Sequence, residues 1–508
     1  MSFNSATGVK APVSFSGVDW GKGLKARPIR RIMLVKPGVH YPRRAYGNPL
    51  GLLILVSILR RDFPGEFEID LVDQALYRLG PKQMAERIRR FNPDLIGFSC
   101  LSVDAAPMHV LTRAAKEINP EIVTVLGGPH ATMFWDLALQ DPYLDLVVLH
   151  EGDVTFPELL KALRDGIDPA GVEGLAFRRY GEIVKTPDRE LIQDMDSIPF
   201  PAWDLVDFDR YGREMSMNGN CYYQRWAMVN TSRGCPYHCI YCHMIFGKKQ
   251  RCRSAENVLE HIELLVRGYG VKELHIVDDI FNLDLPRAKM ICQQILERDL
   301  KVKIAFPNGL RGDRMDRELI HLLKLAGCYA ITYGVETATP RLQTITRKNL
   351  NLEKVREAIA WTYETGIVPQ GFFMLGFPGE TPAEMKDTVN WAIRSKLLRS
   401  WFFTVIVYPR TPLFDMALEA YPHLDFSISD LVAQRPWAEN DLYTKATGTN
   451  LARIVRDANR SFYLRPRVIL DLIWRLLKNL FLFRGIYWGL RAVLSSLAQI
   501  EKNVYRAS

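Results

Sequence analysis

Short apolar strands alternate with helical segments along most of the chain, and this pattern limits the fold more than any other feature. Apolar runs such as 31–36 and 95–99 are each followed by a segment of helical periodicity. Strands that alternate with helices predict parallel sheets covered by the connecting helices. In the second half, charged residues or glycines follow the strands, as in barrels that carry functional groups at the strands' carboxyl ends. The sequence therefore predicts an α/β protein with a doubly wound, Rossmann-like first domain and a partial TIM-like (β/α) barrel.

The length supports more than one domain, because 508 residues exceed what a single core usually contains. The expected strands are 31–36, 68–72, 95–99, 123–126 and 146–149 in the first domain, and 227–230, 273–277, 302–305, 330–335, 370–375 and 401–407 in the barrel. The expected parts are a flexible arm over 1–28, the first domain over 29–170, a bridging hairpin and linker over 171–225, the barrel over 226–424 and a helical, basic C-terminal region over 425–508.

The net charge of +9 is concentrated at the end of the chain. Residues 451–508 hold eleven Lys and Arg against three Asp and Glu, which leaves the rest close to neutral. A basic tail of this kind argues against a nucleic-acid partner for the protein as a whole. The N-terminus lacks a basic region followed by an apolar core, and most of the eight cysteines are scattered. We therefore expect a cytoplasmic location.

Three cysteines occupy one short loop, with the spacing CxxxCxxC at Cys235, Cys239 and Cys242. Three thiolates so close together can hold three irons of a 4Fe–4S cluster, which usually takes four cysteines. The missing fourth ligand leaves one iron open. A structural zinc site is the alternative, with His238, His243 or Cys252 as a further ligand. The remaining cysteines are interpreted as isolated buried thiols: Cys100, Cys221, Cys252, Cys292 and Cys328.

The cysteine spacing and the tyrosine before the last cysteine resemble the radical S-adenosylmethionine (SAM) enzymes. In that family SAM occupies the open iron, and an electron from the cluster cleaves it to a 5′-deoxyadenosyl radical. The resemblance implies contacts with the SAM amino group, carboxylate, ribose and adenine at the ends of the barrel strands. The residues in these positions are Tyr241 and Gly376 for the adenine, Asp278 and Asp279 for the amino group, Arg314 for the carboxylate and Glu336 for the ribose.

The first domain resembles the cobalamin-binding domain that precedes many radical SAM modules. The resemblance lies in 93–99, in Gly-Gly-Pro-His at 127–130, and in 148–156. It implies that cobalamin contacts Ser99, Gly127, Gly128, Glu151 and Gly152. The Asp-x-His-x-x-Gly loop of methionine-synthase-type domains is not found, although the corresponding region contains His40. We therefore expect no protein histidine on cobalt.

The two resemblances together imply a cobalamin-dependent radical SAM enzyme that methylates an unactivated carbon. The alternatives are oxidative cyclisation or ring rearrangement with the same cofactors, as in the anaerobic cyclase of chlorophyll synthesis, and a non-catalytic cobalamin or iron–sulfur sensor. An external electron donor is expected, and the basic, apolar tail favours a lipid, isoprenoid or tetrapyrrole as the small-molecule substrate.

The segment 468–500 is rich in Leu, Ile, Phe and Trp with interspersed basic residues. Two interpretations remain open for it. It is either a helical cap packed on the barrel or a peripheral contact with an anionic membrane surface.

Overall fold

The computed structural model describes residues 28–41, 44–219, 221–243, 245–424 and 441–478. The expected arm over 1–28 lies almost entirely outside these residues. The chain forms two compact units. The first comprises Met1–Pro42, Pro49–Leu191 and Ile198–Leu205, and the second comprises Arg43–Asn48, Ile192–Ser197 and Val206–Ser508.

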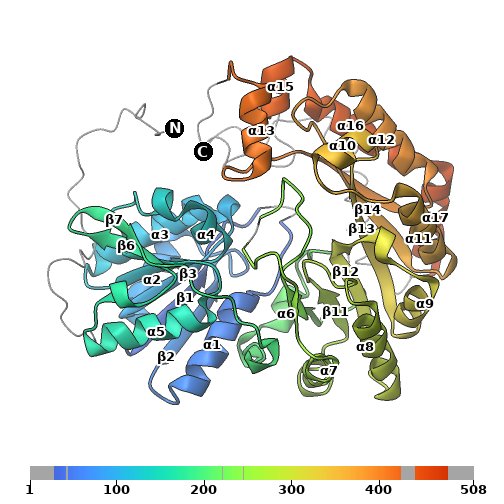
Figure 1. Ribbon diagram of the computed structural model, residues 1–508. Helices are drawn as coiled ribbons and strands as arrows, with labels where there is room; N and C mark the ends of the chain where they lie inside the picture. The colour runs from blue at the N-terminus through green and yellow to red at the C-terminus, as the bar shows by residue number, and fades with distance from the viewer. Residues whose placement is uncertain (1–27, 42–43, 220, 244, 425–440, 479–508) are drawn as a thin grey trace. The chain divides into compact units, whose positions relative to one another are not determined.

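The first unit is built on a seven-stranded sheet with the order β2-β1-β3-β4-β5-β6-β7 (Figure 1). The first five strands are parallel, and β6 and β7 are antiparallel to their neighbours. Their bounds are β1 Arg31–Lys36, β2 Glu68–Asp73, β3 Leu95–Ser99, β4 Val123–Gly127, β5 Leu146–Val148, β6 Leu175–Arg179 and β7 Glu182–Lys185.

Helices cover both faces of this sheet, as the alternation predicts. Alternate strand residues such as Leu34 and Met33 enter two separate cores. One core includes α1 (Leu50–Asp62) and α5 (Gly152–Asp165). The other includes α2 (Pro81–Phe91), α3 (Ala105–Ile118) and α4 (Pro129–Ala138). Burial on both faces explains why the central strands are almost wholly apolar.

Two features of this unit differ from the expectation. The hairpin β6–β7 does not belong to a separate bridge, because β6 pairs with β5 and extends the sheet. A sequence shows a hairpin's turn but not the strand against which it pairs. Helix α4 was not expected, because Gly128 and Pro129 were read as a loop, whereas Pro129 is the first residue of the helix.

The second unit contains six parallel strands in the order β15-β14-β13-β12-β11-β8, the sheet of a partial barrel (Figure 1). The bounds are β8 Trp226–Val229, β11 Glu273–Ile276, β12 Lys303–Leu310, β13 Cys328–Glu336, β14 Val368–Leu375 and β15 Arg399–Thr404. The connecting helices are α7 Ala255–Glu263, α8 Leu285–Glu297, α9 Arg317–Leu325, α11 Leu352–Glu364 and α12 Pro382–Arg394.

Each of these helices begins at a side chain that accepts a hydrogen bond from a first-turn amide, which fixes where the helix starts. The capping residues are Ser254, Asp284, Asp316, Asn351 and Thr381. These polar caps separate the strand-end loops from the helices, so the loops remain available for function.

The C-terminal region is helical where it is described. Its helices are α15 (Leu442–Thr447), α16 (Leu451–Tyr463) and α17 (Pro466–Lys478), and α13 (Pro412–Ala420) precedes it. Helix α16 packs on the edge strand β15, where the Tyr463 hydroxyl donates to the carbonyl of Ser400 at 2.8 Å and accepts from its amide at 3.3 Å. The Phe462 ring lies 6.2 Å from the ring of Phe402. Of the segment 468–500, for which a cap and a membrane contact are both open, α17 contains the described part, and residues 479–508 lie outside the described part of the chain.

Candidate functional site

The cysteine loop is closed at its base by a short antiparallel pair, β9 (Ser232–Arg233) and β10 (Arg251–Cys252). Gly234, the first residue of the loop, has a φ of +87°, and a Cβ there would overlap the carbonyl oxygen of Lys249. Only glycine permits this close approach of the two ends of the loop. The chain between 234 and 250 is thereby folded back on itself, with the three cysteines on it.

Two of the three thiols are in direct contact. Cys239 and Cys242 share a hydrogen bond, and this bond, together with the positive charges of Lys348 and Arg311, holds the pKa of Cys239 below its usual range against the effect of burial. Cys235 lies close enough to Cys239 for the two charges to interact. Burial raises the pKa of Cys235. Three sulfurs from one loop, one of which has a lowered pKa, fit an iron–sulfur cluster with three protein ligands.

The carboxyl end of β11 anchors this loop through two adjacent aspartates. Asp278 is buried and accepts bonds from the Thr231 amide at 2.6 Å, the Thr231 hydroxyl at 2.5 Å and the Ser232 hydroxyl at 2.6 Å. Among the described residues, Asp279 accepts the Gly234 amide at 3.0 Å. Protein donors therefore engage Asp278, and of the two residues expected at the SAM amino group, Asp279 has the more available carboxylate.

Glu336, the residue expected at the ribose, ends β13 with a φ of +66°. Its Oε1 atom lies 3.3 Å from the Nζ atom of Lys348. Burial raises the pKa of Glu336, which Lys348 opposes. Burial works against the charge of Lys348, but Glu336 and the two cysteines outweigh it and raise the pKa of the ammonium group. A Cβ on Gly334 would lie 2.8 Å from the Glu336 carboxylate, so glycine at 334 makes room for this pair.

Lys348 was not expected as a site residue, although it follows Glu336 by only twelve positions in the sequence. Its segment is docked on the cysteine loop: the Ile240 amide donates to the Thr346 carbonyl at 3.0 Å, and the Cys239 thiol approaches the Arg347 carbonyl at 3.9 Å. The twelve-residue spacing between Glu336 and Lys348 does not by itself predict that their side chains pair. A basic residue on the turn after a strand-end acid is the pattern that would have found it.

Arg314, expected at the SAM carboxylate, is joined by a second arginine. Arg314 donates to the Tyr237 hydroxyl at 3.1 Å, and the guanidinium of Arg311 lies 3.7 Å from the centroid of the Tyr237 ring. Arg311 also pairs with Asp313 at 2.9 Å and is the more deeply buried of the two. Because its charge acts on Cys239, Arg311 is a second site residue that the sequence did not single out.

Gly376 and Tyr241, expected near the adenine, lie in one packed region with Phe377. The Tyr241 ring is 6.0 Å from the Phe377 ring, and its buried hydroxyl lies close to the Cys239 thiol, where it helps to lower the pKa of Cys239. Gly376 has a φ of +90°, and a Cβ there would overlap Leu451 of α16. Glu380 accepts from the amides of Gly376 and Phe377 at 2.6 and 3.0 Å. The glycine at 376 is therefore required by helix packing, whatever it also contacts.

The residues expected to contact cobalamin all lie at the carboxyl ends of the parallel strands of the first sheet. Ser99 ends β3 and Gly127 ends β4, while Gly128, Glu151 and Gly152 begin the helices α4 and α5. The carboxyl ends of parallel strands are where ligands bind on such sheets. A Cβ on Gly128, whose φ is +88°, would lie 2.8 Å from the Ser99 hydroxyl oxygen and 3.3 Å from the Cys100 amide nitrogen. Glycine at 128 is therefore required by its positive φ and by the close approach of Ser99 and Cys100, and a role in cobalamin binding remains a prediction.

Comparisons with known proteins agree with this geometry. Residues 229–392 match the model of the radical SAM superfamily, and residues 42–160 match the model of the B12 binding domain. An uncharacterized methyltransferase of Pyrococcus horikoshii is 30% identical over 449 residues, which cover 87% of this chain and 94% of the relative. The chain belongs to the radical SAM enzymes that carry a B12-binding domain.

Two further relatives bear on this B12-dependent radical SAM enzyme. The anaerobic magnesium-protoporphyrin IX monomethyl ester cyclase of Rubrivivax gelatinosus is 28% identical over 380 residues, or 73% of this chain and 66% of the cyclase. The structure of the radical SAM methyltransferase TsrM from Kitasatospora setae superimposes with a TM-score of 0.64 at 21% identity, covering 77% of this chain and 76% of that one. The last comparison supports the predicted fold, with its α/β first domain, parallel-stranded barrel and helical C-terminus.

Membership in this family makes the protein an enzyme whose cofactors are a 4Fe–4S cluster, SAM and cobalamin. The expectation of a zinc site in the cysteine loop is thereby set aside in favour of the cluster. The individual residues assigned to SAM and cobalamin remain predictions. Among the residues that the structure describes, no helix is both long and apolar enough to cross a membrane.

Proposed function

We propose that this enzyme methylates an unactivated carbon of a small organic substrate. When bound, the cluster and SAM supply a hydrogen-abstracting 5′-deoxyadenosyl radical, and cobalamin supplies the methyl group. The observation that carries the proposal is length: the chain spans 94% of the methyltransferase relative but only 66% of the cyclase. A methyltransferase of the same size needs no additional domain to account for its activity.

In this proposal the protein's own groups hold and orient the reactants. Asp279 and Arg314 would hold the amino and carboxylate groups of SAM, and Glu336 would accept two hydrogen bonds from its ribose hydroxyls. Lys348 is a positioning residue, because its ammonium group opposes the rise in the pKa of Glu336 that burial causes. Such an ion pair favours the ionised carboxylate, whose two oxygens both accept hydrogen bonds. Burial alone would favour the protonated carboxyl group.

The test is an anaerobic incubation of reconstituted enzyme with SAM carrying a deuterated methyl group, a strong reductant and cobalamin. We expect 5′-deoxyadenosine from the parent enzyme, no detectable product from Cys239→Ala, and unchanged formation by Cys252→Ala, whose thiol lies at the base of the same loop. Candidate lipids, isoprenoids and tetrapyrroles are then screened for a product that gains one CD₃ group in place of hydrogen. No 5′-deoxyadenosine from enzyme with a full cluster would contradict the proposal and favour a sensor.

A cyclase-like oxidation is the second candidate, since the cyclase relative matches 73% of this chain. It uses the same binding residues but leaves the carbon count of the substrate unchanged. The product mass therefore separates the two: a loss of hydrogen, or a gain of oxygen without CD₃, favours the cyclase-like reaction. Both reactions need an external electron donor to reduce the cluster.

We also propose that α17 contacts an anionic membrane surface. Leu470, Ile473 and Trp474 on this helix are 64%, 46% and 50% exposed, respectively. A truncation before α16 is a poor test, because Leu451 packs on Gly376. The better test compares flotation of the full chain with anionic vesicles before and after Leu470→Glu and Trp474→Glu. Equal flotation would rule out the contact.

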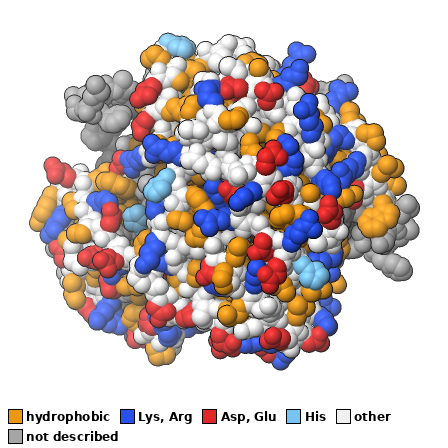
Figure 2. Space-filling view, turned by 45° about the vertical axis from the view of Figure 1, so that its right-hand side comes forward, with side chains coloured by type: hydrophobic (Ala, Val, Ile, Leu, Met, Phe, Trp, Pro, Cys, Tyr) orange, Lys and Arg blue, Asp and Glu red, His pale blue; other side chains and the backbone are white. Residues whose placement is uncertain are grey.

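The charged side chains on the face drawn in Figure 2 do not form a continuous basic surface. Lys and Arg are interspersed with Asp and Glu over the side chains shown. Nucleic-acid binding usually depends on a contiguous basic patch. This face is therefore consistent with a small-molecule substrate.

A further inference from the structure

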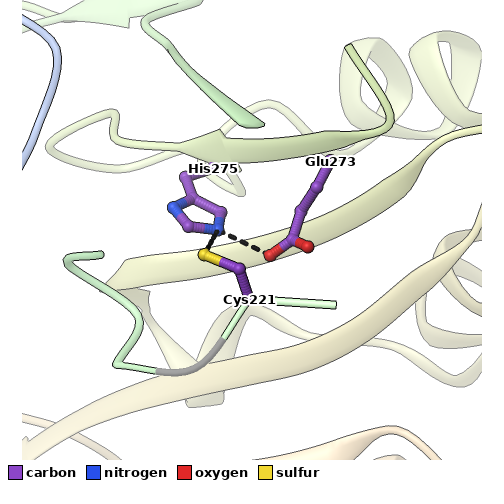
Figure 3. A group of neighbouring side chains, drawn as sticks. All are labelled: Cys221, Glu273 and His275. Atoms are coloured by element: carbon purple, nitrogen blue, oxygen red, sulfur yellow. Dashed lines mark hydrogen bonds and ion pairs between the residues drawn. The ribbon is translucent and has the colours of Figure 1, made fainter. Parts of the chain in front are cut away.

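A second cluster of metal-ligating side chains lies at the amino-terminal end of β11, away from the cysteine loop. Glu273 and His275 are alternate residues of this strand, so both side chains point to the same side of the sheet. Cys221 reaches them from the segment before β8, and Figure 3 shows the three side chains converging. Asp278 and Asp279 follow the other end of the same strand. The two clusters are therefore separate sites.

The donor atoms are close enough to share one ion. The Nε2 atom of His275 lies 2.9 Å from Oε1 of Glu273 and 4.0 Å from Sγ of Cys221, and all three atoms lie within 4.8 Å of one another. Around a tetrahedral zinc, the ligand atoms lie about 2.0–2.3 Å from the metal. The distances between such ligand atoms are comparable to those between the three donor atoms of this cluster. Thiolate, imidazole and carboxylate together form a ligand set typical of zinc.

The surrounding structure fixes the two strand residues in position. Oε2 of Glu273 accepts the amides of Tyr222 and Tyr223 at 2.6 and 2.8 Å, and Oε1 accepts the Tyr329 hydroxyl at 2.6 Å. Hydrogen bonds of this kind to a liganding carboxylate are the usual second support of a metal site. The fully buried His275 ring stacks on Trp226 at 5.1 Å, which leaves its Nε2 edge facing the cluster.

The composition of the cluster suits a cation. Cys221 and Glu273 offer a sulfur and a carboxylate oxygen, and among the described residues His275 is the only basic side chain that contacts Glu273. A divalent zinc ion would be bound by this thiolate, imidazole nitrogen and carboxylate together.

We propose that Cys221, Glu273 and His275 bind one zinc ion that pins the segment before β8 to the amino end of the barrel. When the ion binds, the Cys221 thiol proton leaves to solvent, and the neutral His275 ring coordinates through Nε2 with its single proton on Nδ1. Three protein ligands leave one position for water. The proposal is independent of the reaction at the other end of the barrel.

The experiment uses the full chain with Cys235, Cys239 and Cys242 replaced by serine, so that the cysteine loop cannot bind the probe. Zn²⁺ is added, the protein is dialysed against a weak chelator, and the metal is counted per chain. We expect one zinc in this parent, at least tenfold weaker binding after Cys221→Ala or His275→Gln, and unchanged binding after Cys292→Ala. Cys292 is a buried thiol on α8 and serves as the matched control.

Co²⁺ provides the second measurement, because a cobalt–thiolate bond gives a charge-transfer absorption band. The band should appear in the parent and in Cys292→Ala and disappear in Cys221→Ala. If the ligand variants do not fold, the parent decides: zinc must raise its unfolding temperature, and cobalt must give the band. Folded parent protein that retains no zinc, or equal retention by Cys221→Ala, would mean that the three side chains form only a hydrogen-bond network.

Discussion

At each end of strand β11, a buried carboxylate accepts hydrogen bonds from a neighbouring segment of the chain. At the carboxyl end, Asp278 accepts the Thr231 amide and two hydroxyls and so holds the start of the cysteine loop. At the amino end, Glu273 accepts the amides of Tyr222 and Tyr223 and the Tyr329 hydroxyl. In both places a buried carboxylate replaces the water that the loop's donors would otherwise bind.

The two ends differ in how far apart their sulfur ligands and partners lie in the sequence. The three thiols of the carboxyl end come from a single loop, whereas Cys221 and His275 are 54 residues apart. The first set is recognisable as a motif and the second is not. The ligands of a site at the end of a barrel strand can therefore come from one short segment of the sequence, or from distant segments that the tertiary structure brings together.

Of the changes at the two ends of β11, Asp278→Asn should have the largest effect on stability and on iron binding. The amide would turn an N–H group toward the donors of Thr231 and Ser232, leaving buried donors unsatisfied, so we expect the free energy of unfolding to fall by about 2–4 kcal/mol. Iron bound per chain after reconstitution should fall with it. Denaturant unfolding and iron analysis measure both, and Asp279→Asn, which affects the single bond from the Gly234 amide, is the control. Full iron loading in Asp278→Asn would show that this aspartate does not organise the cysteine loop.

Glu273→Gln is the matching change at the amino end. It should lower the free energy of unfolding by about 2–3 kcal/mol, because one buried donor of the Tyr222–Tyr223–Tyr329 set loses its acceptor. Iron loading should stay at the parent value, since the partners of Glu273 among the described residues are Tyr222, Tyr223, His275 and Tyr329, outside the cysteine loop. A loss of iron as large as that of Asp278→Asn would erase the distinction between the two ends.

Gly376→Ala tests whether the strand end near the expected adenine is shaped by helix packing. Gly376 and Gly379 both have positive φ, at +90° and +72°, but only at Gly376 would a Cβ meet other atoms, those of Leu451. We expect Gly376→Ala to cost about 1–3 kcal/mol more than Gly379→Ala, because overpacking adds to a similar backbone penalty. Thermal or denaturant unfolding measures the difference, and adding Leu451→Ala should recover most of it. No recovery would assign the cost to the backbone.

Lys348→Met should have a smaller effect, confined to the carboxyl end. Without its partner, buried Glu336 takes up a proton and loses an acceptor for the ribose, so SAM should bind about tenfold more weakly, or about 1.4 kcal/mol. Equilibrium binding of SAM to the reconstituted enzyme is the measurement, and Lys348→Arg should retain most of the affinity. Equal SAM affinity in Lys348→Met and the parent would remove Lys348 from the positioning groups.

Much of the fold follows from local patterns, as particular elements show. The run 31–36 becomes β1 with the expected bounds, and the expected strand at 370–375 lies within β14, Val368–Leu375. Helix α4 was not predictable from local patterns, because Pro129 starts this helix, whereas a proline more often ends one. The place of the hairpin β6–β7 was not predictable either, because it depends on the partner strand β5. Local periodicity gives the element, and pairing comes from the rest of the molecule.

The candidate site divides along the same line. Cys235, Cys239 and Cys242 were identified because their chemistry depends on short spacing, and Glu336 because it ends a strand. Lys348 and Arg311 were not, since their distance from Cys239 is set by how the strand-end turns fold over the cysteine loop. Asp278 is predicted at the SAM amino group, and the structure adds that its carboxylate accepts from Thr231 and Ser232.

The sequence by itself therefore determined the family and the two α/β units, and it predicted the cluster ligands, because these depend on periodicity and on residues close together in the chain. Only the tertiary structure decided that Lys348 pairs with Glu336, that Leu451 packs on Gly376, and that Cys221 meets Glu273 and His275. The physical reason is that parallel strands bring distant residues to a common end of the sheet. Which of them touch depends on side-chain packing that no local pattern records.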